Sequence, residues 1–464
     1  MKFELNTSKF AFLLALPVFV YINARAYLLA FTYDECWTYL GYATDDFWKV
    51  VTNEFPAANN HVLHSLAMGL VDSFFGQYEY ALRLPVLFSF IVFAVFVYKI
   101  AIRLSAKMWW LPFILIIYQP YLLDYFVAAR GYGMALAFMF GSIYYLYLFA
   151  EQEQSKWMLL SLIFAALASY SNFTYLLVFI AVALAVLVLS IRKNSALKGS
   201  ISIGIIGLLL LGAVYKPISQ LIEAKELYYG GNIGFFEDTL STLSRSFIYS
   251  TSESIILAVF FAFIIAASGV LGLAKFFSKA KLDLGFWLTF LLIVLEVGTI
   301  LQHHVMGSPY LINRTAIFFI PLILFSFSWL IDQLRDGLLR NILAFGFVFM
   351  SVINLLSALN ISYLLDFKEY ADVQTAMKMV RDDERIPKAD FAIGKSIYLN
   401  APINFYRVKY GLERIAQSGL EYCEETDQTK YYYLFEKDIE CVASKETELI
   451  YAFPVSHTYL YRVP

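Results

Sequence analysis

Apolar residues occur along this chain in long unbroken blocks that are separated by short polar segments. Most blocks lack the 3.6-residue alternation of a helix that buries only one of its faces. A helix of about 20 residues crosses a hydrocarbon layer of about 30 Å, at 1.5 Å per residue. The pattern therefore predicts a series of membrane-spanning helices.

We expect eleven such spans, at about 10–30, 83–98, 108–123, 131–150, 157–171, 173–191, 199–216, 254–274, 284–302, 314–331 and 341–364. The stretch 157–191 contains no charged residue and is too long for one crossing, so a tight hairpin is expected at Ser169, Ser171 and Asn172. The first block follows Lys2 and Lys9 but has no small-residue cleavage site after it. We expect it to be retained as a span.

The distribution of lysine and arginine over the loops predicts the orientation of the chain. With the N-terminus in the cytoplasm, the cytoplasmic loops hold Lys2, Lys9, Lys99, Arg103, Lys107, Lys156, Arg192, Lys193, Lys198, Lys275, Lys279, Lys281, Arg335 and Arg340. The opposite loops are longer in total and hold about half as many basic residues. An odd number of spans then places the C-terminus outside, on the same side as the loops 31–82 and 217–253.

The C-terminal segment 365–464 has the composition of a water-soluble domain. An amphipathic helix is expected over 369–383 and short strands over 390–393, 430–435 and 449–453, which together predict a small α/β domain. Cys423 and Cys441 can form a disulfide if this domain lies in an oxidising compartment. The expected fold is thus an all-α polytopic membrane domain, 1–364, followed by an extracytoplasmic α/β domain, 365–464.

Composition supports the membrane assignment and narrows the function. Hydrophobic residues make up 60% and charged residues 16% of the chain, against about 25% charged residues in an ordinary soluble domain. The net charge of −2 provides no basic surface for nucleic acid. Three cysteines are too few for a four-thiolate zinc site.

Ionisable residues cluster at the outer ends of the expected spans. They are Arg25, Asp34, Glu35, His61, His64, Arg83, Asp124, Arg130, His303, His304 and Arg314. Charges at this depth are costly unless they face a polar cavity or one another, so we expect a shared outer cavity.

Asp34 and Glu35 directly follow the first span and are the candidate catalytic acids. A carboxylate there can act as the general base for an acceptor hydroxyl, or it can simply cap the end of a membrane helix. The segment 59–76 is short and apolar and is expected to lie along the interface. In its Asn-Asn-His-x-x-His run, Asn60 is a candidate for positioning the acceptor, and His61 and His64 share a helical face that suits a divalent metal, a phosphate or a purely structural role.

Asp124 and Arg130 flank the turn before the fourth span, where Arg130 begins the run Arg-Gly-Tyr-Gly that contains Tyr132. The arginine fork matches phosphate oxygens, although the two charges can also pair with each other. His303, His304 and Arg314 can stabilise a departing phosphate. Arg83, in Leu-Arg-Leu-Pro, is expected to anchor a helix start.

These motifs, in this order, resemble bacterial members of the GT-C glycosyltransferases. The resemblance is to the branch that contains protein O-mannosyltransferases and the lipid A aminoarabinose transferase, and it is strongest over the first 150 residues. It implies an inverting transfer of one sugar from a polyprenyl phosphate donor to a glycan, lipid or protein acceptor at the outer face of the inner membrane. It also implies that Asp34 is the base, that Asp124 positions the donor or, with His61, a divalent metal, and that Arg130, Tyr132 and Arg314 bind the donor phosphate.

Two other classes of function remain open at this point. A flippase or transporter usually has internal repeats and ionisable residues near the membrane midplane, and no clear repeat is found in this chain. A polysaccharide polymerase or ligase usually carries its arginines in one large outer loop, whereas the loop 217–253 holds only Lys225 and Arg245.

Overall fold

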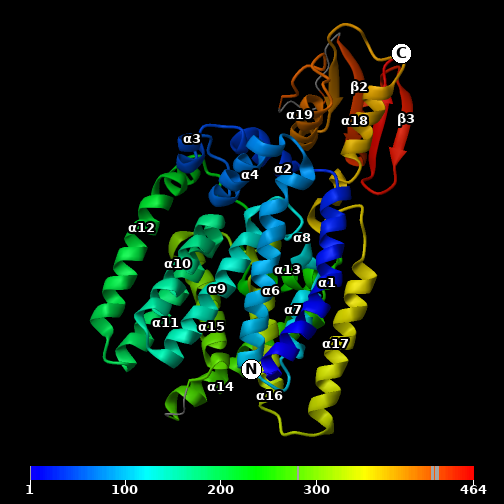
Figure 1. The fold of residues 1–464 in the computed structure, drawn as a ribbon. Coiled ribbons are helices and arrows are strands. Elements are labelled where there is room, and N and C mark those ends of the chain that lie inside the picture. Colours follow the sequence, from blue (N-terminus) through cyan, green and yellow to red (C-terminus); the bar gives the residue numbers. More distant parts are fainter. Residues whose placement is uncertain (1, 279–281, 420–422, 424–427) are drawn as a thin grey trace. The chain divides into compact units, whose positions relative to one another are not determined.

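The computed structural model describes residues 2–278, 282–419, 423 and 428–464 (Figure 1). Lys279 and Lys281, which were assigned above to a cytoplasmic loop, lie outside the described residues. Helices dominate the chain, and a small sheet of four strands lies near its C-terminus.

In the described part of the chain, eight helices are long and apolar enough to cross a membrane. They are α1 (Lys2–Leu28), α6 (Leu84–Leu104), α9 (Gly131–Gln152), α11 (Leu176–Arg192) with the turn that precedes it, α12 (Ala196–Glu223), α14 (Ile255–Phe277), α15 (Leu284–Met306) and α17 (Leu338–Ala358). Three shorter apolar helices accompany them, α4 (Val62–Phe75), α10 (Ser155–Ser171) and α16 (Phe319–Asp332). The chain is therefore a multi-span membrane protein.

The remaining predicted spans are shorter or interrupted in the structure. The span expected at 108–123 consists of α7 (Trp110–Ile117) and α8 (Pro120–Asp124). Pro120 has no backbone N–H, so a new helix begins there, and Gln119 caps it by accepting a hydrogen bond from the Leu122 amide at 3.0 Å. The predicted hairpin is confirmed, because α10 ends at Ser171 and Asn172 accepts a hydrogen bond from the Thr174 amide.

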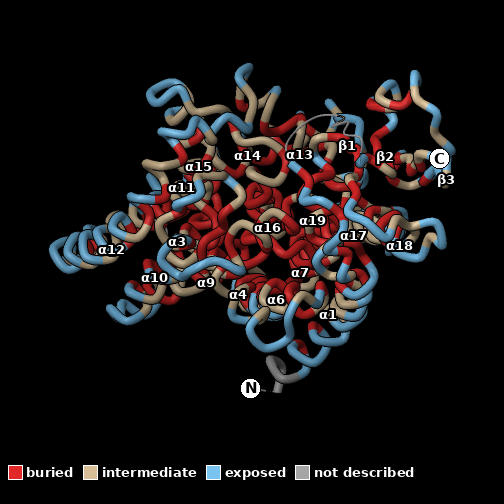
Figure 2. The backbone as a smooth tube through the Cα atoms, turned by 90° about the horizontal axis from the view of Figure 1, so that it is seen from above, coloured by how far each residue is buried: buried red, intermediate tan, exposed pale blue. Residues whose placement is uncertain are grey.

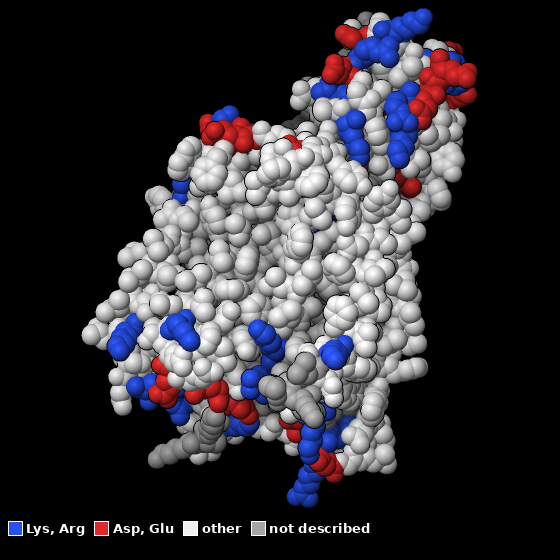
Figure 3. Space-filling model, in the orientation of Figure 1, with Lys and Arg blue, Asp and Glu red and all other residues white. Residues whose placement is uncertain are grey.

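The chain divides into two compact units, of which the first contains residues 1–23, 47–64 and 85–359. Within this unit α9 is the most enclosed long helix, with 72% of its span buried, whereas only 17% of α12 and 11% of α17 are buried (Figure 2). On the face shown in Figure 3, the long helices carry a broad belt without Lys, Arg, Asp or Glu, and basic residues collect, with some acidic ones, at the end where the N-terminus lies. Both features match helices that face lipid.

The second unit contains residues 24–46, 65–84 and 360–464. Its sheet has the order β1-β2-β4-β3, with β1 (Ala392–Lys395) parallel to β2 (Thr429–Phe435), and with β4 (Thr458–Arg462) antiparallel to both β2 and β3 (Glu448–Phe453). Helices α18 (Val373–Asp382) and α19 (Asn400–Lys409) complete the α/β fold. The predicted small C-terminal α/β fold is confirmed, and β4 is an additional strand.

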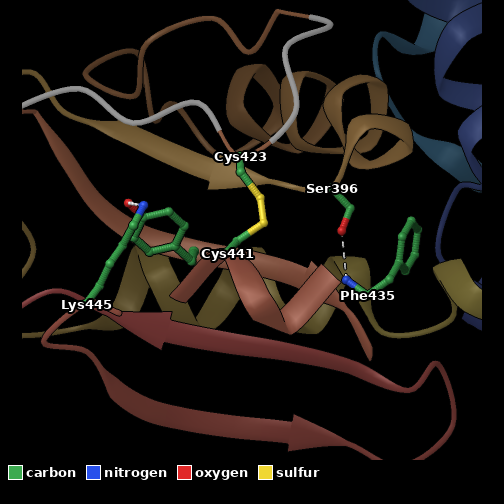
Figure 4. Close-up of a disulfide and its surroundings, with 6 residues drawn as sticks. Ser396, Cys423, Phe435, Cys441 and Lys445 are labelled. Carbon is green, nitrogen blue, oxygen red and sulfur yellow. Dashed lines mark hydrogen bonds between the residues drawn. A yellow bond between two sulfur atoms is a disulfide. The ribbon is translucent and has the colours of Figure 1, made fainter. Parts of the chain in front are cut away.

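Cys423 and Cys441 form a disulfide (Figure 4). The bridge links Cys423 to a short helix, η7 (Glu436–Val442), that follows β2, and both cysteines pack against the buried side chains of Tyr432 and Leu434. In the same close-up, the hydroxyl of Ser396 accepts a hydrogen bond from the Phe435 amide at 2.9 Å. These contacts fix the C-terminal end of β2 against the loop after β1.

Candidate functional site

Asp34 lies in the first turn of a short helix, α2 (Tyr33–Thr38), directly after α1. Thr32 caps this helix, because its hydroxyl accepts a hydrogen bond from the Glu35 amide while its own amide donates to the Glu35 carboxylate at 2.9 Å. This reciprocal arrangement is a capping box and fixes where the helix begins. The side chain of Asp34 is 6% exposed.

Glu35 has a structural contact that sets it apart from Asp34. Its two carboxylate oxygens accept hydrogen bonds from Nε and Nη2 of Arg83, each at 2.9 Å, and both side chains are fully buried. Arg83 donates three further hydrogen bonds to backbone carbonyls at the end of α1, those of Ala26, Leu29 and Ala30. Arg83 is thus the anchor expected at this helix start, and Glu35 holds α2 against the end of α1, which leaves Asp34 as the candidate base.

Helix α19 packs directly on α2 within the second unit. The Phe405 ring stacks on Phe31 at 4.9 Å and meets the Tyr39 ring edge-on at 5.3 Å. The hydroxyl of Tyr406 accepts a hydrogen bond from the Phe31 amide at 2.9 Å, and Lys409 pairs with Glu79. The C-terminal residues therefore help to fix the helix that carries Asp34.

In the first unit, Arg130 is the N-cap residue of α9 and is 2% exposed. Its guanidinium donates to the backbone carbonyl of Asn59 at 3.2 Å and to the side-chain oxygen of Asn59 at 3.1 Å. A Cβ at Gly131 would lie 2.0 Å from the Ser171 carbonyl oxygen and 2.8 Å from the His61 Cβ. Glycine is thus required for the close packing that brings Arg130, the Asn59 loop and His61 together.

His61 and His64 lie buried beside Arg130. The ring of His61 meets the Tyr132 ring at 4.9 Å, and the ring of His64 is fully buried. Neither ring nitrogen of His64, nor Nε2 of His61, has a hydrogen-bond partner among the residues that the structure describes. Burial, and then the positive charge of Arg130, lower the pKa of His61 and lower the pKa of His64 to about 3. Both imidazoles are therefore neutral near pH 7 and can each donate one N–H.

Two further predicted residues have hydrogen-bond partners within the first unit. The Asp124 carboxylate accepts hydrogen bonds from the Tyr249 hydroxyl at 2.9 and 3.1 Å. The Asn60 amide donates to the Val50 carbonyl at 2.9 Å and to the Asn53 side chain at 3.0 Å. Asn60 thus holds the loop to the end of α3 (Phe47–Thr52), which is a structural role.

Arg314 contacts the segment 226–240. Its guanidinium is 4.5 Å from the centre of the Tyr229 ring and donates to the Tyr229 hydroxyl at 3.3 Å. The neighbouring Asn313 accepts a hydrogen bond from Arg245 at 2.6 Å. The charge of Arg314 is also one cause of the lowered pKa of His61. Arg314 and Arg130 therefore both lie within electrostatic reach of His61.

His303 and His304 end α15 and have contacts of another kind. The His303 ring stacks on Tyr310 at 4.2 Å, and its Nδ1 is 2.9 Å from the Ser308 carbonyl oxygen. Tyr310 in turn forms backbone hydrogen bonds with Gly231. These contacts favour a structural role for His303 at the C-terminal end of α15, where the centre of the His304 ring lies 5.2 Å from that of His303.

The predicted metal site at Asp124 and His61 has no complete ligand set in the described ranges. No group of three or more His, Cys, Asp or Glu side chains with metal-binding geometry occurs there. Asp34 and Arg130 belong to different compact units, so the shared outer cavity stays a prediction.

Sequence reasoning missed several side chains of the first unit. Tyr249 on Asp124, and Tyr229 and Arg245 around Arg314, come from the loop 217–253. Asn172 and Tyr175, at the hairpin that supplies the Ser171 carbonyl, each bury a polar atom without a partner among the described residues. The available signal was the number of tyrosines in that loop and the asparagine in the hairpin.

Comparison with solved structures shows which known fold the chain has. Two structures of ArnT from Cupriavidus metallidurans, one in the apo state and one bound to undecaprenyl phosphate, each match with a TM-score of 0.56 and 10% sequence identity over 98% of both chains. The chain has the fold of ArnT. The resemblance seen in the sequence motifs is thereby confirmed at the level of fold. The arabinosyltransferase EmbB from Mycobacterium smegmatis also matches, with a TM-score of 0.44 and 11% identity over 88% of this chain and 43% of that one.

Sequence comparisons add no closer relative. No family model matches the chain, and no curated protein matches it.

Proposed function

We propose that this protein is an inverting glycosyltransferase that acts at the outer face of the inner membrane. It moves a sugar from a polyprenyl-phosphate donor to a hydroxyl of a glycan, lipid or protein acceptor. The observation that carries the proposal is the buried group of Arg130, His61 and His64 at the start of α9, in a chain with the fold of a protein solved with undecaprenyl phosphate.

The group around Arg130 suits a lipid phosphate. A buried polar atom without a partner is costly, so the free nitrogens of His61 and His64 favour a ligand that accepts hydrogen bonds. The guanidinium of Arg130 supplies positive charge and the N-terminus of the 22-residue helix α9 adds its partial positive charge. Because the imidazoles are neutral, they donate hydrogen bonds while Arg130 and Arg314 neutralise the phosphate.

Asp34 supplies the base for the acceptor. The acceptor oxygen attacks the anomeric carbon of the sugar while the Asp34 carboxylate takes the hydroxyl proton. The bond between the anomeric carbon and the phosphate oxygen breaks through an oxocarbenium-like state, and its electron pair stays on the polyprenyl phosphate. Attack from the face opposite the leaving group inverts the anomeric configuration. Glu35 does not take part in this step and holds α2 in place through Arg83.

The outward orientation belongs to the proposal. The Cys423–Cys441 disulfide supports an oxidising compartment for the C-terminal residues. The basic residues at the end of the first unit where the N-terminus lies support a cytoplasmic N-terminus.

The test is transfer by the purified protein in lipid nanodiscs, with a panel of polyprenyl-phosphate sugars and radiolabelled sugar as the readout. Asp34→Asn is expected to lower kcat by about 100-fold or more, since general base catalysis contributes roughly that much. Asp46→Asn is the matched control, because Asp46 is an exposed acid of the same outer loop.

Three outcomes decide the matter. Transfer with inverted configuration that is lost in Asp34→Asn and kept in Asp46→Asn supports the proposal. Full transfer by Asp34→Asn removes the base assignment. Movement of intact lipid-linked sugar across the bilayer without transfer would identify a flippase instead.

A further inference from the structure

Three tyrosines of the second unit form an aromatic corner next to Asp34. They are Tyr33 of α2, Tyr370 at the end of a short helix, η5 (Leu365–Tyr370), and Tyr398 of the turn η6 (Ile397–Leu399). The Tyr33 and Tyr370 rings are nearly parallel, 26° apart with centres at 6.1 Å. The Tyr398 ring stands at 89° to Tyr33 at 5.7 Å. Parallel and perpendicular rings thus meet in one corner.

The corner is open to solvent on one side and closed on the other. Tyr398 is 52% exposed, Tyr33 is half-buried and Tyr370 is 6% exposed. Tyr370 also lines a small cavity, together with Ala30, Thr32, Tyr363, Leu364 and Phe367, among others. An exposed tyrosine in an L-shaped arrangement with two more enclosed ones offers a flat apolar face to a molecule that arrives from water.

The corner lies within electrostatic reach of the candidate base. Burial raises the pKa of Tyr370, and the negative charges of Glu369 and Asp34 raise it further. Tyr33 directly precedes Asp34 in the same helical turn. A ligand that rests on these rings therefore lies within electrostatic reach of the carboxylate that would receive its proton.

We propose that Tyr33, Tyr370 and Tyr398 form the acceptor subsite and that the acceptor bound there is a neutral saccharide. This inference rests on the proposed function, because it assigns a substrate to Asp34. A sugar ring has an apolar C–H face that stacks on aromatic rings and a rim of hydroxyls that bond with carboxylates and phenols. The acids Glu369 and Asp366 lie near the corner together with Lys437, so its surroundings carry no excess of positive charge that would favour an anionic acceptor.

The proposal gives the C-terminal residues a role in the reaction. Tyr370 and Tyr398 come from the segment 360–464, whereas Tyr33 comes from the first outer loop. Helix α19 starts two residues after Tyr398 and packs on α2, so these rings keep their positions relative to Asp34. The C-terminal residues thus select the acceptor as well as stabilise the unit.

Saccharide binding can be measured without turnover, by saturation-transfer difference NMR on the full-length protein in nanodiscs. The probes are neutral oligosaccharides of glucose, mannose, galactose and arabinose, with glucose 6-phosphate as the anionic comparison. We expect saturation of ring protons for at least one neutral probe and none for glucose 6-phosphate. Tyr398→Ala is expected to weaken binding by about fivefold or more, and Tyr398→Trp to retain it.

Tyr451→Ala is the matched control, because Tyr451 is a 47% exposed tyrosine on β3 of the same unit. Binding that falls only in Tyr398→Ala supports the proposal. Absence of binding for every neutral probe, stronger binding of the phosphorylated probe, or an equal loss in Tyr398→Ala and Tyr451→Ala would overturn it. Saccharide binding without transfer would instead count against the proposed function alone, and transfer to a non-saccharide acceptor would count against this inference alone.

Discussion

Replacement of Arg83 by methionine tests how the helix that carries Asp34 is held. Arg83 is fully buried and makes five hydrogen bonds, two to the Glu35 carboxylate and three to carbonyls at the end of α1. Methionine fills part of the volume but donates none of these bonds. The substitution leaves the Glu35 carboxylate buried without its cation.

The expected loss of stability follows from those contacts. Removal of one partner of a buried ion pair costs about 3–5 kcal/mol, because the other charge stays buried. Each of the three carbonyls that loses its hydrogen bond costs about a further 1–3 kcal/mol of stability where water cannot reach it. Taking the ion pair alone, a loss of about 4 kcal/mol lowers the melting temperature of a 464-residue protein by roughly 4 °C, because its unfolding entropy is about 2.1 cal/mol/K per residue.

The assay is thermal unfolding in nanodiscs, followed by intrinsic fluorescence, for Arg83→Met, for the double variant Glu35→Leu/Arg83→Met, and for Arg103→Met. The double variant is expected to recover part of the loss, since both partners become apolar. Arg103 is exposed in the last turn of α6, so its replacement is expected to change little. If Arg83→Met melted at the temperature of Arg103→Met, or if the double variant were no better than Arg83→Met, the assigned role of the pair would be wrong.

Three further predictions concern packing, protonation and topology. Gly131→Ala is expected to lower the melting temperature, because its Cβ would lie 2.0 Å from a backbone oxygen, whereas Gly212→Ala has no atom within 4 Å and serves as control; equal melting temperatures would contradict this packing. The pKa of His64 is lowered from 6.5 to about 3, so the unfolded chain binds more protons over that range and stability should fall as the pH drops below about 6.5. Melting curves from pH 7.5 to 4.5 should show a shallower fall in His64→Asn, and identical slopes would refute the assignment. Cys423→Ser should free the thiol of Cys441 for a membrane-impermeant maleimide in intact cells, and labelling only after permeabilisation would place this part of the chain inside.

The apolar blocks were sufficient to place the helices, but not to show where a span breaks. The spans expected at 131–150, 254–274 and 284–302 correspond to α9, α14 and α15. The span expected at 108–123 is interrupted at Pro120, because the apolar run continues through the proline without a change of composition. Strand β4 alternates buried and half-buried residues, yet its tyrosines suit both faces of a sheet, so the pattern does not distinguish it from a loop.

The burial of the candidate site residues was predictable from the sequence, whereas their pairings were not. Asp34, Arg130 and His64 are all buried in the protein. This was expected, because an ionisable side chain exposed to lipid is costly and therefore faces polar groups inside the protein. The pair Glu35–Arg83 joins residues 48 positions apart, and no local pattern records such a contact. The same holds for Tyr249 on Asp124, which depends on how a distant loop folds back onto α8.

The most direct test of the phosphate site is a titration of the protein in nanodiscs with polyprenyl phosphate alone, which is the leaving group of the proposed reaction. Arg130→Gln is expected to weaken binding by about tenfold or more, since a hydrogen bond to a charged group contributes about 1.5–3 kcal/mol. Asp34→Asn and the exposed-residue control Arg103→Gln are expected to bind as the wild type does. Unchanged affinity in Arg130→Gln, or an equal loss in Arg103→Gln, would contradict the assignment of the lipid phosphate to the start of α9.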